Sequence, residues 1–150
     1  MISNKTKIEL IASKRTIKGS LKNINIHFNT REISNEFWME ISSLFAIKSK
    51  TYLIKQAICF LAGSLTISEK GYFDQLDFDK ISVVLNDVMQ KNIEYKNINN
   101  EEIVSFFIPQ WQVAMIASSL PKCKSVDKFI KLSLEKSHSL LLSSFQEGEF

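Results

Sequence analysis

Glycine, proline, cysteine and histidine are scarce in this sequence. Its 150 residues include 4 Gly, 2 Pro, 2 Cys and 2 His. So few glycines argue against collagen-like repeats, flexible linkers and glycine-rich phosphate loops. Cys59 and Cys123 have no partners at zinc-ligand spacing, so neither a metal site nor a cofactor is expected. Both cysteines lie in apolar stretches, and we expect buried, reduced thiols in a cytoplasmic protein.

Long apolar runs are missing as well. The N-terminal residues carry a glutamate and several lysines where a signal peptide needs an unbroken apolar stretch. The most apolar window, Tyr52–Ile67, contains Lys55 and Gln56 and is too polar for a membrane span. Residues 146–150 match no lipidation signal. The sequence therefore predicts neither export nor contact with a membrane.

The remaining composition is that of an ordinary globular domain. Hydrophobic residues make up 45% of the chain and charged residues 23%. The 11 Phe argue against disorder, because disordered chains are poor in aromatic residues. The length suits one compact domain or two very small ones.

Charge is distributed unevenly along the chain. Residues 1–60 hold 10 Lys and Arg against 4 Asp and Glu, whereas residues 61–150 hold 9 against 12. The basic first part is the place where contact with a polyanion is expected. A lysine-rich surface that serves solubility alone is the alternative interpretation of the same pattern.

The clearest strand signal lies at Lys22–Asn29. Apolar and polar residues alternate strictly there, which is typical of a half-buried strand. The apolar positions are Ile24, Ile26 and Phe28, and the polar positions between them are Asn23, Asn25 and His27. Residues 1–21, with Lys14, Arg15 and Lys18, are expected to form a basic N-terminal arm.

Two helices are predicted after this strand. Thr30 is placed to cap a helix over Glu32–Phe45. After a break at residues 46–48, Ser49 or Thr51 is placed to cap a second helix that ends at Gly63.

Residues 64–101 are expected to form a connector that contains one amphipathic helix, opened by Asp77 or Asp79. Its apolar residues recur at helical spacing: Ile81, Val84, Leu85, Val88 and Met89.

The second half repeats the order of elements found in the first. An apolar run at Ile103–Ile108 is followed by helical spacing over Gln110–Leu120 and by a final helix capped by Ser125. The unit is expected to span residues 102–141, and residues 142–150 are expected to fray. Lys48–Ile58 can be laid on Lys124–Leu134, where four positions are identical: Lys48/Lys124, Ser49/Ser125, Ile54/Ile130 and Lys55/Lys131. We infer an internal repeat, with Phe28 aligned to Phe107 in the strands.

Residues 22–63 resemble the ribbon-helix-helix family of DNA-binding proteins, the class of Arc and MetJ. The matching features are the strand NINIHF, the helix REISNEFWMEISSLF and the segment KSKTYLIKQAICFL. The turn between the helices usually carries a glycine in this family, and here it contains Ala46. Residues 102–141 resemble the family more weakly.

The resemblance implies a mainly α fold with one short two-stranded antiparallel β-ribbon. A lone strand with two amphipathic helices cannot pair its edge or bury its apolar faces, so it needs a second copy. In the family that copy is another chain. Here residues 102–141 can supply it, which predicts a tandem pseudo-dimer with the middle helix as a bridge. The family includes tandem members, some of them accessory proteins of plasmid and T-DNA transfer.

The resemblance also implies how DNA would be bound. Family members insert the ribbon into the major groove, so Asn23, Asn25 and His27 are the expected base-reading residues. Ser49, Lys50 and Thr51, at the start of the second helix, are expected to bind a phosphate. Further phosphate contacts are expected from a set of basic residues: Lys22, Arg31, Lys48, Lys14, Arg15 and Lys18. The chain would act as a repressor or as an accessory factor of a mobile element.

Each of these residues also has a structural interpretation. The polar strand residues are equally consistent with a solvated strand face, and Ser49 and Thr51 with ordinary helix caps. The second strand offers no matching polar face. Its outward residues are Glu102, Val104 and Phe106 in one register, or Ile103, Ser105 and Phe107 in the other. The second half is then a scaffold, or two chains pair through their first halves.

An enzyme is not expected. Ser125 and Lys128 have the Ser-x-x-Lys spacing of some acyl-transfer enzymes, but the companion motifs are absent. The alternative function is a protein-interaction module without DNA, such as a helical adaptor or a secretion chaperone. In that case the run Ile103–Ile108 forms a partner-binding strand, and changes at Phe106 or Trp111 should matter.

Overall fold

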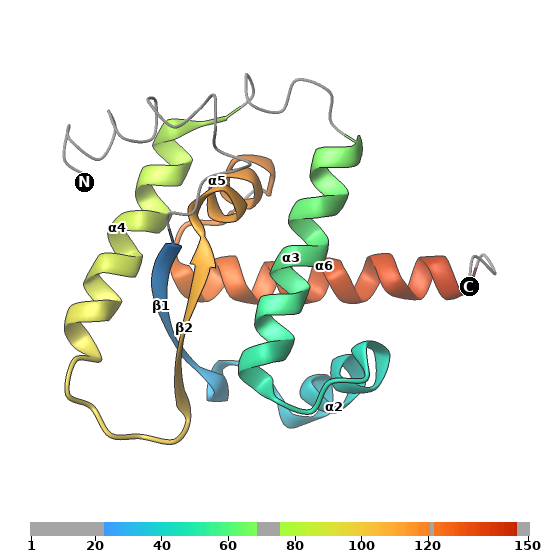
Figure 1. Ribbon diagram of the computed structural model, residues 1–150, viewed down its shortest axis with the longest axis horizontal. Helices are drawn as coiled ribbons and strands as arrows, with labels where there is room; N and C mark the ends of the chain where they lie inside the picture. The colour runs from blue at the N-terminus through green and yellow to red at the C-terminus, as the bar shows by residue number, and fades with distance from the viewer. Residues whose placement is uncertain (1–22, 69–75, 121, 147–150) are drawn as a thin grey trace.

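The computed structural model describes residues 23–68, 76–120 and 122–146. It is mainly helical, with one two-stranded antiparallel sheet in the described part of the chain (Figure 1). The elements in chain order are β1 (Asn23–Asn29), the 3₁₀ turn η3 (Thr30–Glu32), α2 (Asn35–Phe45), α3 (Lys50–Ser68), α4 (Phe78–Glu94), β2 (Ile103–Pro109), α5 (Gln110–Ser119) and α6 (Val126–Gln146). The predicted ribbon, formed by two strands far apart in the sequence, is confirmed.

The ribbon has one buried and one outward face. The central pair is Ile26 opposite Phe106, and both side chains are buried. The other inward residues of β1 are Ile24 and Phe28, as the alternation predicts. In β2 the inward residues are Val104, Phe106 and Ile108, so Ser105 and Phe107 face outward. Of the two registers open to the sequence, the structure has the second.

This register shows that the predicted alignment of Phe28 with Phe107 is wrong. Phe28 is fully buried, whereas Phe107 is 57% exposed. Matching the central pair, Ile26 to Phe106, places Phe28 on Ile108 instead. The connections after the strands explain the mismatch, since η3 and two further residues separate β1 from α2, whereas β2 runs directly into α5.

The first helix begins later than predicted. Ser34 rather than Thr30 caps α2, and its side chain accepts a hydrogen bond from the backbone N–H of Phe37. Thr30 is buried, and both its backbone N–H and its hydroxyl donate to the carbonyl oxygen of Glu102. Its hydroxyl therefore ties the end of β1 to the residue before β2 and is not free to cap a helix.

The turn between α2 and α3 uses the left-handed backbone region. Ala46 has φ 56° and ψ 39°, and its N–H donates to the carbonyls of Ser42 and Ser43. A glycine would fit this position without strain, because glycine carries no Cβ. The turn between α2 and α3 thus has an alanine at a left-handed position.

Ala46→Gly is expected to raise the free energy of unfolding by about 0.5–1 kcal/mol. The left-handed conformation costs alanine about 1–2 kcal/mol, and glycine avoids this cost. Part of the gain is lost because glycine has more conformational freedom in the unfolded state. Urea denaturation followed by circular dichroism measures the difference. Ala46→Val is the matched control and should destabilise, since a β-branched residue suits this conformation least. A destabilised Ala46→Gly variant would contradict the assigned backbone.

Helix α3 passes through Gly63 and continues to Ser68, so the predicted end at Gly63 is wrong. A Cβ added at Gly63 would meet no atom within 4 Å, and the residue acts there as an ordinary helical position. Helix α6 likewise continues to Gln146, beyond residue 142, where the sequence places the start of the tail.

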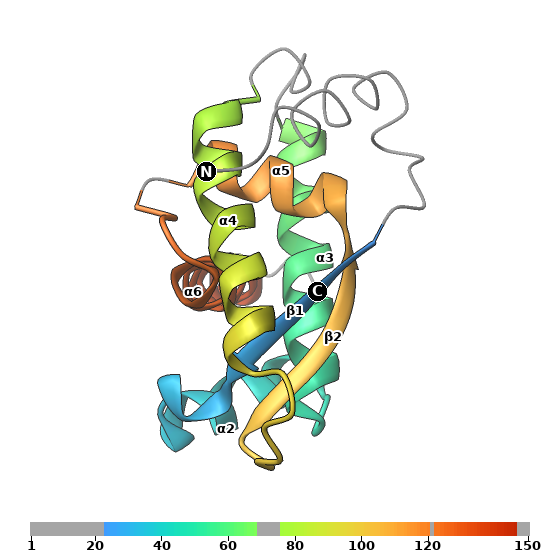
Figure 2. The ribbon, with the colours of Figure 1, turned by 90° about the vertical axis from the view of Figure 1, so that its left-hand side faces the viewer.

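Helix α4 is capped by Asp77, whose carboxylate accepts from the backbone N–H groups of Asp79 and Lys80. Its buried residues are Ile81, Val84, Leu85 and Val88, as predicted. Met89, predicted to be part of this face, is 56% exposed. In Figures 1 and 2, β1 lies between β2 and α4, and α4 packs against β1, α5 and α6.

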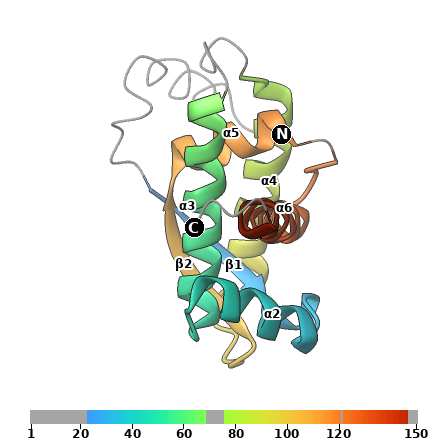
Figure 3. The ribbon, with the colours of Figure 1, turned by 90° about the vertical axis from the view of Figure 1, so that its right-hand side faces the viewer.

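The core joins the two halves of the chain. Helices α3 and α6 cross each other beside the ribbon in Figure 1 and are in contact, with α6 seen end-on in Figure 3. The Ser137 hydroxyl on α6 donates to the carbonyl of Ala57 on α3 at 2.9 Å, inside the core. Phe28 and Ile41 from the first half and Phe129 from the second are fully buried in the same cluster.

One of the two thiols departs from the prediction. Cys123 is buried, and burial raises the pKa of its thiol to about 12. Cys59 is exposed on α3 rather than buried. Its neighbours Ala57 and Ile58 take the core-facing positions of the helix.

Candidate nucleic-acid interface

The outward face of the ribbon gathers the polar residues of both strands. Asn23 is exposed, and Asn25 and His27 are half-buried. From β2 the exposed Ser105 lies among them, and its hydroxyl donates to the Asn25 Oδ1 at 2.9 Å. This bond links the two strands across the outward face. Asn25 therefore keeps its amide N–H₂ group for other partners, while its oxygen is engaged.

His27 is held by the end of α4. Its Nδ1 lies 2.8 Å from the Oδ1 of Asn92, and the Nδ2 of Asn92 donates to the backbone carbonyl of Asn25 at 3.2 Å. The rings of His27 and Tyr95 lie 6.1 Å apart between centroids. The edge of β1 that does not pair with β2 is thus covered by side chains of α4.

The start of α3 carries the expected phosphate-binding residues. The Ser49 hydroxyl accepts from the backbone N–H of Tyr52 at 3.3 Å, so Ser49 caps the helix. The ammonium group of Lys50 lies 5.4 Å from the Trp38 ring centroid, a cation–π distance. Lys48 and Lys50 border one hollow, whose other lining residues are Trp38, Met39, Ser42 and Leu53. Thr51 is half-buried in the first turn.

Trp38 lines this hollow and is held by a hydrogen bond. The residue is 4% exposed, and its indole Nε1–H donates to the Thr30 carbonyl at 3.0 Å. The ring thus connects the residue after β1 to the start of α3. Two lysines and the amide end of a helix next to a fixed ring favour binding of an anion.

Arg31 is less available than the sequence indicates. Its side chain is 75% exposed, but its Nε lies 3.8 Å from the Glu102 Oε1. Glu102 also accepts a hydrogen bond from the Thr30 hydroxyl at 3.1 Å. A carboxylate beside the guanidinium weakens the attraction of Arg31 for an anion.

The start of α6 differs from the start of α3 in its charges. Ser125 caps α6 as Ser49 caps α3, its hydroxyl accepting from the Lys128 N–H at 3.1 Å. However, the backbone N–H of Val126 donates to the Asp87 carboxylate at 2.7 Å. Asp87 belongs to α4, so the middle helix supplies a negative charge at the amide end of α6.

A second carboxylate adds to this charge. Asp127 lies in the first turn of α6, and burial raises the pKa of its carboxyl group while the charge of Lys91 opposes the shift. Burial by itself would lower the pKa of Lys91, but the negative charges of Asp127, Tyr95, Glu94 and Asp87 raise it. Lys91 remains protonated and balances the cluster. The start of α6 thus already carries the charge of nearby carboxylates, whereas the start of α3 borders the hollow lined by Lys48 and Lys50.

Several predicted residues lie outside the described part of the chain. These are the arm residues Lys14, Arg15 and Lys18, and Lys22 just before β1.

Sequence reasoning missed the residues that α4 adds to the interface. Asn92, Tyr95 and Asp87 lie in the segment that was predicted to be a connector with a bridging helix. The amphipathic pattern of α4 marks its apolar face, whereas Asn92 and Asp87 are half-buried polar residues without a motif. The sequence carries no signal that pairs Asn92 with a strand residue 65 positions away.

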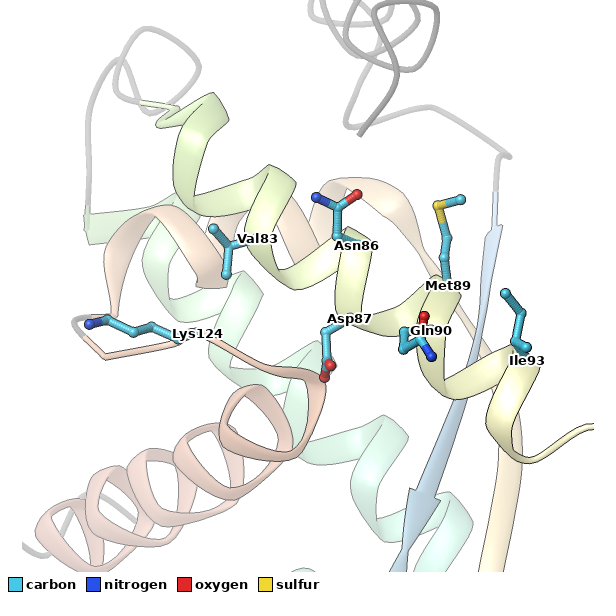
Figure 4. Close-up of a pocket in the computed structure, with 7 residues that line it drawn as sticks. All are labelled: Val83, Asn86, Asp87, Met89, Gln90, Ile93 and Lys124. Atoms are coloured by element: carbon cyan, nitrogen blue, oxygen red, sulfur yellow. The ribbon is translucent and has the colours of Figure 1, made fainter. Parts of the chain in front are cut away.

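The outer side of α4 carries a hollow with several exposed apolar side chains. Val83 is 46% exposed, Met89 56% and Ile93 69%. Figure 4 shows them on α4 together with Asn86, Asp87 and Gln90, while the last lining residue, Lys124, comes from the segment between α5 and α6. Single exposed apolar residues are common on protein surfaces, but several along one helix are typical of a contact surface.

Comparisons with protein-family models, with curated protein sequences and with solved structures give no significant match. Among the helices that the structure describes, none combines the length and the hydropathy that crossing a bilayer requires. In the same residues, no three His, Cys, Asp or Glu side chains come together in a way that could hold a metal ion.

Proposed function

We propose that this chain binds double-stranded DNA through the outward face of its β-ribbon, as a tandem, single-chain relative of the ribbon-helix-helix class. The observation that carries the proposal is the pairing of β1 with β2. Two strands from distant parts of one chain form an antiparallel ribbon, and each strand precedes two helices. The family members that carry one such unit per chain need two chains to build this arrangement.

The packing of the helices supports an internal pseudo-dimer. Helix α2 contacts α6 of the other half, and α5 correspondingly contacts α3. Ser49 and Ser125 cap α3 and α6 with the same hydrogen bond, to the N–H three residues later. Leu53 and Phe129, which follow at the same distance, are both in the core. Each half thus packs one of its helices against a helix of the other half within a single core.

A two-stranded ribbon fits the major groove, where each base pair presents its own pattern of donors and acceptors. Asn23, Asn25 and His27 supply side chains that can bond to base edges. The partner strand contributes Ser105, which orients Asn25, and the exposed Phe107. An aromatic side chain there is able to contact a thymine methyl group. The base-reading surface is consequently unequal in its two halves.

Phosphate contacts are assigned to the first half. Lys48, Ser49 and Lys50 surround the amide end of α3, and a DNA phosphate there would gain from two charges and the helix dipole. At the start of α6, the backbone N–H of Val126 already donates to the Asp87 carboxylate. A protein of this kind would occupy a DNA site asymmetrically, and it would act by occupancy as a repressor or as an accessory factor on mobile DNA.

The double variant Lys48→Ala/Lys50→Ala tests this assignment. We expect it to weaken duplex binding, and to reduce the slope of log K against log[salt] by about 0.9 for each lost phosphate contact. Fluorescence anisotropy with a labelled mixed-sequence duplex at several salt concentrations gives both quantities. Lys55→Ala/Lys136→Ala removes two exposed lysines elsewhere on α3 and α6 and should leave the slope unchanged. Equal slopes for both double variants would contradict a phosphate site at α3.

A second candidate function is binding of a protein partner. The observation in its favour is the group of exposed apolar residues on α4, with Met89 and Ile93 the most exposed. The sequence suggests Phe106→Ala as a test of partner binding, but the Phe106 side chain is buried on the inward face of β2. That substitution would therefore change the core and not the exposed surface. Met89→Ser and Ile93→Ser change the exposed surface instead. Loss of a partner with unchanged DNA binding would assign a separate role to α4.

A further inference from the structure

Asn92 bonds to two parts of β1 at once, and this fixes the orientation of its own amide group. One end of the amide lies 3.2 Å from the backbone carbonyl of Asn25, which can only accept a hydrogen bond. That end must be the Nδ2 donor. The other end, Oδ1, then faces the Nδ1 of His27 at 2.8 Å. Because an amide oxygen only accepts, Nδ1 of His27 must carry the proton.

A neutral histidine protonated on Nδ1 has an unprotonated Nε2, which accepts hydrogen bonds. In the described part of the chain, no hydrogen-bond partner of Nε2 is found. The ring is also contacted by Tyr95, whose own ring lies 5.8 Å from the Lys91 ammonium group. The end of α4 therefore sets both the tautomer and the position of the His27 ring.

We propose that Asn92 is a positioning residue for base recognition, which holds His27 in the Nδ1–H tautomer so that Nε2 acts as a hydrogen-bond acceptor. The proposal rests on the proposed DNA-binding function. In the major groove the hydrogen-bond donors are the amino groups of adenine and cytosine, whereas guanine presents O6 and N7, which are acceptors. His27 is thus predicted to select adenine or cytosine at the base it contacts and to discriminate against guanine.

The tautomer can be measured without DNA. Long-range ¹H–¹⁵N spectra at pH 8 distinguish Nδ1–H from Nε2–H, and the chain has two histidines, so His138 serves as an internal reference. We expect the Nδ1–H form at His27 in the wild type and its loss in Asn92→Ala. Asn92→Asp keeps an acceptor for Nδ1–H and should retain the tautomer. Asn86→Ala, on the same helix, is the matched control.

The effect on recognition is measured by selecting duplexes from a random pool. The wild type should prefer adenine or cytosine at one position, and Asn92→Ala should reduce that preference about tenfold. The salt dependence of non-specific binding should stay unchanged, since no phosphate contact is lost. Asn92→Asp should retain the preference.

The two proposals fail in different ways. If the wild type binds no duplex, the proposed function is wrong, and so is the base preference. The spectra would still show whether Asn92 sets the tautomer of His27. An Nε2–H form in the wild type, or an unchanged tautomer in Asn92→Ala, overturns the positioning role. Duplex binding with an unchanged base preference in a folded Asn92→Ala variant overturns it as well.

Discussion

Phe28→Ala is expected to lower the free energy of unfolding by about 3–5 kcal/mol, the range for deleting a fully buried phenylalanine. Phe28 is 0% exposed and lies in the core beneath the ribbon. The loss combines the transfer free energy of the removed ring with the cavity that remains in a closely packed interior. Urea denaturation followed by tryptophan fluorescence measures it.

Phe107→Ala is the matched control for this prediction, because it makes the same change in the other strand. Phe107 is 57% exposed on the outward face, so its removal should change stability by no more than about 0.5 kcal/mol. The sequence aligns these two phenylalanines, and the structure places them on opposite faces. Comparable losses of stability in the two variants would contradict the register of β2.

Asn25→Ala/His27→Ala is expected to reduce discrimination between the preferred DNA site and random DNA about 30-fold or more. A good side-chain contact to a base edge contributes about 1–3 kcal/mol of discrimination, and this variant removes two. Binding to random DNA should change little, because phosphate contacts dominate non-specific affinity. Competition titrations against both duplexes measure the ratio of the two affinities.

The fold of this double variant is checked against a control of the same chemistry. Asn99 is exposed in the segment before β2, so Asn99→Ala removes an amide outside the ribbon. It should keep both affinities. Asn25 and Ser105 bond across the strands, and a small loss of stability in the double variant is expected from this contact. Retained discrimination in a folded Asn25→Ala/His27→Ala variant would mean that another surface reads the DNA.

The first strand was predictable because its two faces differ in chemistry. Alternation of Ile24, Ile26 and Phe28 with polar residues specifies the inward face, and the structure has the same faces. The second strand was not predictable in register. Its residues are apolar at nearly every position, so a shift by one residue exchanges Phe106 and Phe107 without any cost visible in the sequence.

Helix caps were predictable only where a side chain had no competing partner. Asp77 and Ser125 cap their helices as predicted. Thr30 has the chemistry of a cap, but β2 brings the Glu102 carbonyl to it, and that contact spans 72 positions in the sequence. Local patterns contain no information about such a partner. The first helix is therefore capped by Ser34.

The role of α4 is the part of the interface that the sequence could not provide. A bridging helix was predicted from its apolar stripe, but its polar contacts depend on where the helix lies beside β1. That position brings Asn92 to His27 and Asp87 to the first turn of α6. As a result, the middle helix positions His27 in one half of the candidate site, and in the other half it places a carboxylate at the start of α6.

The central claim is that the ribbon of a single chain contacts duplex DNA. Titration of ¹⁵N-labelled protein with a short mixed-sequence duplex, followed by amide chemical shifts at about 50 mM salt, tests it most directly. We expect the largest shift changes in β1 and the outward positions of β2, together with the first turn of α3, and small changes in the first turn of α6. Shift changes confined to the outer side of α4, or none at all in the folded protein, would contradict it.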